Sequence, residues 1–92
     1  MFSNPRPNLY ESSEGFSVEV LALFQVLYRD GGRCMLFESE PVGGGTMTLY
    51  LPRRAKWAPP YDSEAVEDQE LALVVNNISR AFLSQGLKIE VG

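Results

Sequence analysis

The chain has 92 residues, 45% of them hydrophobic and 22% charged, with no histidine and one cysteine. This length corresponds to one domain, and the balance is that of an ordinary globular protein rather than a disordered or fibrous one. The formal net charge of −4 disfavours nucleic acid as a direct partner, because phosphate binding needs a basic surface, and it favours a basic protein partner instead.

Two further features bear on location. The first residues lack the apolar segment of a secretory signal, and no run reaches the roughly 18 apolar residues of a membrane span. The single cysteine, Cys34, has no partner for an internal disulfide, which is typical of a reducing compartment. We therefore expect a cytoplasmic protein without a membrane partner.

Residues 1–15 contain two prolines, two asparagines and three serines with little apolar periodicity, so we expect an irregular N-terminal lead-in there. A single domain should follow over residues 16–92.

Phe16–Arg29 alternates at first and then becomes almost continuously apolar, a pattern that fits one strand but also a helix over Leu21–Leu27. The next residues, Asp30-Gly31-Gly32, are typical of a tight turn, and the apolar run Cys34–Phe37 follows them. This order favours a β-hairpin.

The hairpin has a predicted register. If residues 31 and 32 form the turn, Leu27 lies opposite Leu36 on one face and Tyr28 lies opposite Met35 on the other. Both faces are then apolar, whereas a single helix covers only one. The second face must be covered by the lead-in, by a curled neighbouring strand or by another molecule.

Glu38–Gly45 contains a proline and ends in three consecutive glycines, so it is expected to be a loop. The glycines are interpreted as a flexible hairpin connection rather than a phosphate-binding loop, because a strand follows them instead of a lysine and a helix. That strand, Thr46–Leu51, alternates with a period of two and stops at Pro52.

The only basic cluster comes next, formed by Arg53, Arg54 and Lys56, and it leads into Trp57. Two interpretations stay open. Trp57 either folds back on the core beside a solvated stretch, or it joins the arginines in a contact surface, since arginine and tryptophan are frequent energetic anchors of protein interfaces.

Glu67–Val91 predicts an amphipathic helix, a glycine stop and a short closing strand. The apolar stripe comprises Leu71, Val74, Val75, Ile78, Ala81 and Phe82. The polar face comprises Asp68, Gln69, Asn76, Asn77, Arg80 and Ser84. Glu67 and Asp68 are both candidates for the N-cap, with Asp68 favoured by residue type, and Gly86 stands where a C′ residue adopts a positive φ. Leu87–Val91 then alternates like a half-buried strand.

Together these elements predict an α+β fold. A small, mostly antiparallel sheet, built from the hairpin and further strands, packs against one C-terminal amphipathic helix and is closed by the last short strand.

The residues that carry catalysis are largely missing. Without histidine, the commonest general base and metal ligand is absent, and Cys34 lacks its usual activating partner. Glu38 and Glu40 would share one strand face if the strand ran that far, but no neighbouring group completes an acid–base or cation site. The sequence therefore predicts a protein that is not an enzyme and that has no cofactor, metal site or catalytic residue.

Residues 23–92 resemble a known family, the bacterial immunity proteins of polymorphic toxin systems, specifically immunity protein family 74. The resemblance rests on Tyr28-Arg29-Asp30-Gly31-Gly32-Arg33, Glu38-Ser39-Glu40, Leu49-Tyr50-Leu51, Trp57 with its prolines, Val74-Val75-Asn76-Asn77-Ile78 and Gly86-Leu87-Lys88-Ile89-Glu90-Val91. It implies a cytoplasmic antidote that binds a toxin domain, delivered by or encoded beside a secretion system such as contact-dependent inhibition or type VI secretion, and occludes its active site.

A non-catalytic, toxin-neutralising protein is thus the expected function. The candidate partner-binding residues are Tyr28, Arg53, Arg54, Trp57, Tyr61, Glu64, Glu67 and Asp68. The alternative is a small acidic secretion chaperone or assembly subunit, acting as a homodimer through the spare face of the hairpin. An enzyme that uses the carboxylates is the third hypothesis.

Overall fold

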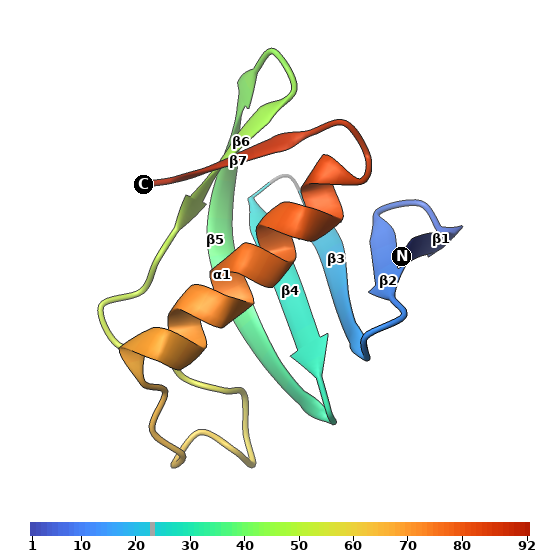
Figure 1. Cartoon of the computed structure of the whole chain (residues 1–92). Helices are drawn as coiled ribbons and strands as arrows, with labels where there is room; N and C mark the ends of the chain where they lie inside the picture. The colour runs from blue at the N-terminus through green and yellow to red at the C-terminus, as the bar shows by residue number, and fades with distance from the viewer. Residues whose placement is uncertain (23) are drawn as a thin grey trace.

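A computed structural model describes residues 1–22 and 24–92 of the chain. Seven strands form one sheet in the order β1-β2-β3-β4-β5-β6-β7, and one helix packs on it (Figure 1). The elements are β1 Phe2–Arg6, β2 Leu9–Ser12, β3 Phe16–Ala22, β4 Gln25–Asp30, β5 Arg33–Gly43, β6 Thr46–Tyr50, α1 Asp68–Leu83 and β7 Lys88–Val91. All neighbouring strands are antiparallel except β6 and β7. The expected α+β class, with a mostly antiparallel sheet and one helix, is confirmed.

The predicted register of the β4–β5 hairpin is confirmed. Leu27 lies opposite Leu36 and Tyr28 opposite Met35. The turn at Gly31 and Gly32 has positive φ at both residues, 58° and 84°, which glycine adopts without a steric penalty.

The structure corrects the bounds of two other predicted elements. The apolar run Phe16–Arg29 forms two paired strands, β3 and β4, rather than one strand or a helix, and Leu23 lies outside the described residues. The predicted loop Glu38–Gly45 is mostly strand, because β5 continues to Gly43. Pro41 is accommodated just before a shift in register, where a missing N–H costs little pairing.

The expectation of an irregular N-terminal lead-in is wrong. These residues form the β1–β2 hairpin at the edge of the sheet. The polar residues that suggested irregularity make its turn. Asn8 has a φ of 67°, and the Asn4 side chain donates hydrogen bonds to the carbonyl oxygens of Arg6 and Leu9 at 2.8 and 2.7 Å. Tyr10 anchors the hairpin, with its ring 5.9 Å from that of Phe82 on α1.

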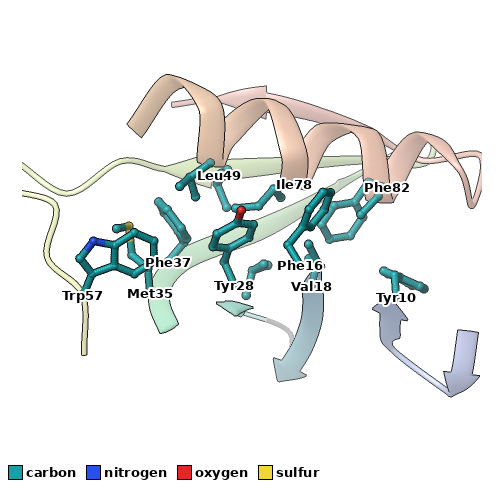
Figure 2. Close-up of a cluster of buried hydrophobic side chains, with 13 residues drawn as sticks. Tyr10, Phe16, Val18, Tyr28, Met35, Phe37, Leu49, Trp57, Ile78 and Phe82 are labelled. Carbon is teal, nitrogen blue, oxygen red and sulfur yellow. The ribbon is translucent and has the colours of Figure 1, made fainter. Parts of the chain in front are cut away.

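The core lies between α1 and one face of the sheet, and Figure 2 shows its side chains from Trp57 at one end to Tyr10 at the other. The helix contributes Val74, Asn77, Ile78, Ala81 and Phe82 as buried residues. Asn77 had been assigned to the polar face, and this was wrong. It is buried because its side-chain amide donates a hydrogen bond to the Tyr28 hydroxyl at 3.0 Å.

The ends of α1 follow elementary capping rules at one terminus only. Of the two candidates for the N-cap, the structure has Glu67 and not the favoured Asp68, and the Glu67 side chain makes no capping hydrogen bond. At the other end Leu87 N–H bonds to the Phe82 carbonyl and Gly86 N–H to the Leu83 carbonyl, the pair of bonds that defines a Schellman motif. Among the described residues, no helix is long and apolar enough to cross a membrane.

Replacing Gly86 by alanine should lower the free energy of unfolding by about 1 kcal/mol, because φ is +76° there and a side chain disfavours that conformation. No neighbouring atom lies within 4 Å of the added Cβ, so backbone strain is the whole effect. Urea denaturation measures it. An unchanged midpoint would contradict this account of the helix end.

Candidate functional site

The two faces of the sheet differ sharply in cover. In β5, Met35, Phe37 and Ser39 are buried on the side of α1, whereas Leu36, Glu38 and Glu40 alternate with them and are exposed. Figure 1 shows α1 crossing one side of the sheet, in front of β4 and β5. The N-terminal hairpin extends the sheet beyond β3 instead of folding over its other side.

The uncovered side carries a small apolar centre. We call it the open face and define it by Leu27 of β4, Leu36, Glu38 and Glu40 of β5, Tyr50 of β6 and Glu90 of β7. Leu27 and Leu36 are direct cross-strand neighbours, and the side chain of Leu36 stays 46% exposed. A leucine that is half exposed on a strand leaves apolar area in water that a partner surface can bury.

In the half of the sheet nearest β3, one carboxylate, Glu19, is paired with two arginines. Arg6 and Arg29 donate hydrogen bonds to its two carboxylate oxygens at 2.9 and 2.8 Å. The hydrogen bond from Arg6, followed by that from Arg29, lowers the pKa of Glu19 from its usual value. Each arginine is therefore already engaged with a carboxylate of the same chain.

The half nearest β7 carries three carboxylates, Glu38, Glu40 and Glu90, and one lysine, Lys88, which lies on the same side of β7 as Glu90. Glu38 lies opposite Tyr50, and Glu40 lies opposite Thr48, which is in turn opposite Glu90. The Tyr50 hydroxyl donates a hydrogen bond to Glu40 at 2.8 Å, and this bond raises the pKa of Tyr50. Within residues 1–22 and 24–92, none of the three carboxylates forms a salt bridge.

Two of the predicted partner-binding residues belong to the core instead. Tyr28 is 1% exposed and Trp57 is 2% exposed. The Trp57 ring packs 6.4 Å from the Tyr28 ring, and the Arg33 guanidinium covers it at 4.2 Å. Of the two interpretations of Trp57, the core position is therefore correct, because its apolar ring completes the end of the cluster that α1 leaves uncovered.

The remaining predicted residues are exposed, but they belong to the connection between β6 and α1 and to the helix start rather than to the open face. These residues are Arg53, Arg54, Tyr61, Glu64, Glu67 and Asp68. Glu64 forms a salt bridge with Arg33 at 3.1 Å, so part of its charge is used within the chain. The sequence alone does not single out Leu36 and Glu90 as surface candidates, although it predicts that one helix cannot cover both faces of the hairpin.

A buried polar chain ties α1 to the sheet. Asn77 donates to the Tyr28 hydroxyl at 3.0 Å, and that hydroxyl donates to Asp30 at 2.9 Å. Burial, more than the bond to Asp30, raises the pKa of Tyr28 to about 12. No group of three or more potential metal ligands occurs in the described part of the chain.

The raised pKa of Tyr28 has a consequence for stability in alkali. The folded state holds the phenolic proton more tightly than the unfolded state does, so this contribution is complete below pH 10 and is lost as the pH rises to about 12. The urea midpoint should fall over that interval in the wild type and fall less in Tyr28→Phe. Tyr61→Phe, at an exposed tyrosine of the connection between β6 and α1, is the control, and an equal loss of pH dependence in both variants would refute the assignment to Tyr28.

Comparison with known proteins adds no relative. No protein family, characterised protein or solved structure matches the chain. The resemblance to the immunity proteins therefore stays a prediction, and the functional argument depends on the open face itself.

Proposed function

We propose that this protein is a non-catalytic immunity protein that binds a cognate bacterial toxin domain in the cytoplasm and neutralises it by occluding its active site. The observation that carries the proposal is the open face, where Leu36 is 46% exposed in the middle of the sheet. Binding alone is sufficient for such an activity, so it requires no catalytic residue or cofactor.

A contact of ordinary size would take only part of the exposed surface of the chain. A stable protein–protein contact buries roughly 800 Å² on each partner, and the whole chain exposes 5716 Å². The open face supplies the apolar centre of such a contact. Leu21 and Phe24, near the facing ends of β3 and β4, are also exposed, at 48% and 54%.

Homodimerisation through the same face, as in a secretion chaperone, is less favourable. Two copies that stacked their open faces with the β5–β7 half of one on the β5–β7 half of the other would bring Glu38, Glu40 and Glu90 close to the same three carboxylates of the other copy. Like charges brought together at an interface repel and weaken association. A partner that differs in charge avoids this cost.

Co-expression with the product of the adjacent gene tests the function. We expect that product to arrest bacterial growth when expressed alone, and we expect growth to be restored when this chain is expressed with it. The two proteins should also co-purify. A neighbouring product that does no harm alone, or a toxin that this chain neither binds nor neutralises, would rule the proposal out.

A further inference from the structure

The charges on the open face point to the chemistry of the partner. Glu19, toward β3, is engaged by two arginines, whereas Glu38, Glu40 and Glu90 have no basic partner in the part of the chain described. Glu38 lies two positions after Leu36 on β5, and Glu40 and Glu90 lie one step further along the same side of the sheet, on β5 and β7. An apolar centre with an acidic margin is complementary to an apolar centre with a basic margin.

We propose that the open face docks a cationic protein surface, in which an apolar side chain seats against Leu27 and Leu36 while lysine or arginine side chains pair with Glu38, Glu40 and Glu90. This inference rests on the proposed function and names the part of the toxin that is bound. The partner surface is a basic one, such as the site at which a toxin would hold a negatively charged substrate.

Other occupants fit the charges less well. A second copy stacked with its β5–β7 half on the same half of the first would place carboxylate against carboxylate, and a nucleic acid would place phosphate against them. A bound metal ion is also disfavoured, because the described carboxylates do not form a group of three potential ligands. The basic protein surface is the occupant that satisfies both the apolar pair and the acidic margin.

A synthetic helical peptide of leucine and lysine is a defined probe, and the same design with glutamate in place of lysine is its control. In NMR titrations of the full chain, the lysine peptide should shift the signals of Leu27, Leu36 and Tyr50 and bind more weakly as salt increases. Neutralising the margin with Glu38→Gln, Glu40→Gln and Glu90→Gln should weaken binding by about tenfold. The glutamate peptide should not bind.

A matched variant, carrying Asp62→Asn, Glu67→Gln and Asp68→Asn, removes the same charge away from the open face. We expect it to bind the lysine peptide like the wild type. Equal weakening in both triple variants, shifts confined to α1, or a dimer in light scattering that blocks the peptide would overturn the inference.

The purified toxin domain separates this inference from the proposed function. If the toxin is neutralised at full potency by the open-face triple variant, the function stands and the docking surface is wrong. If the adjacent gene encodes no toxin, the function fails, while the peptide titrations still decide whether the open face binds a cationic surface.

Discussion

Replacing Phe82 by alanine should lower the free energy of unfolding by about 3–5 kcal/mol, a large share of the roughly 5–15 kcal/mol available to a domain. Phe82 is fully buried, and its ring meets that of Tyr10 edge to face at 5.9 Å. The substitution therefore opens a cavity between α1 and the N-terminal hairpin. Urea denaturation measures the loss.

The neighbouring residue provides a matched control. Leu83 follows Phe82 on the same helix but is 57% exposed. Leu83→Ala should change stability by no more than about 0.5 kcal/mol. Hydrogen exchange should also be faster in β1 and β2 of Phe82→Ala, because Tyr10 loses its partner. Comparable losses for the two variants would show that α1 does not pack as described.

Leu36→Glu should abolish toxin neutralisation while leaving the chain folded. Leu36 is half exposed, so the native fold tolerates a charge there, but a partner that seats an apolar side chain on it would bury an unpaired carboxylate. We expect the toxin affinity to fall by at least about thirtyfold, equivalent to roughly 2 kcal/mol. Growth rescue and calorimetry of the purified pair measure it.

Leu73→Glu is the corresponding control on the opposite side of the molecule. Leu73 is 58% exposed on α1, so it resembles Leu36 in residue type and exposure but not in position. Full rescue is expected from this variant. Should it fail while Leu36→Glu still protects the cell, the toxin would bind the helix side and not the open face.

The β4–β5 hairpin could be predicted from the sequence because the residues that form its turn are adjacent in the chain. Gly31 and Gly32 fixed both the turn and the register, and the register alone showed that Leu27 and Leu36 share a face away from Tyr28 and Met35. The C′ position of Gly86 was equally local. Each of these features depends on residues within a few positions of one another, which pattern reasoning handles well.

Features that depend on distant partners were not predicted. The connection between β3 and β4 has no glycine, proline, asparagine or aspartate to indicate a turn. The sequence therefore does not show that this apolar run forms two strands. Asn77 lies three residues after Val74 and four before Ala81, a spacing that belongs to the apolar stripe, but its polarity assigned it to the wrong face. Its partner, Tyr28, is 49 positions away.

The sequence predicts that a sheet face needs a partner, but it does not predict which residues form that face. The prediction that one helix cannot cover both faces of the hairpin is correct. Tyr28 and Trp57 are predicted as contacts because aromatic residues often anchor interfaces, but both lie in the core. Glu90 joins Glu38 and Glu40 only through the parallel β6–β7 pairing. That pairing joins β6 and β7, which are separated in the chain by all of α1, so no local sequence pattern predicts it.

The most direct test of the open face as a docking surface is methyl NMR of the leucines in the complex with the toxin domain. The account predicts large shifts for Leu27 and Leu36 and little change for Leu73 and Leu83 on α1. Shifts at Leu73 and Leu83 with none at Leu36 would contradict it.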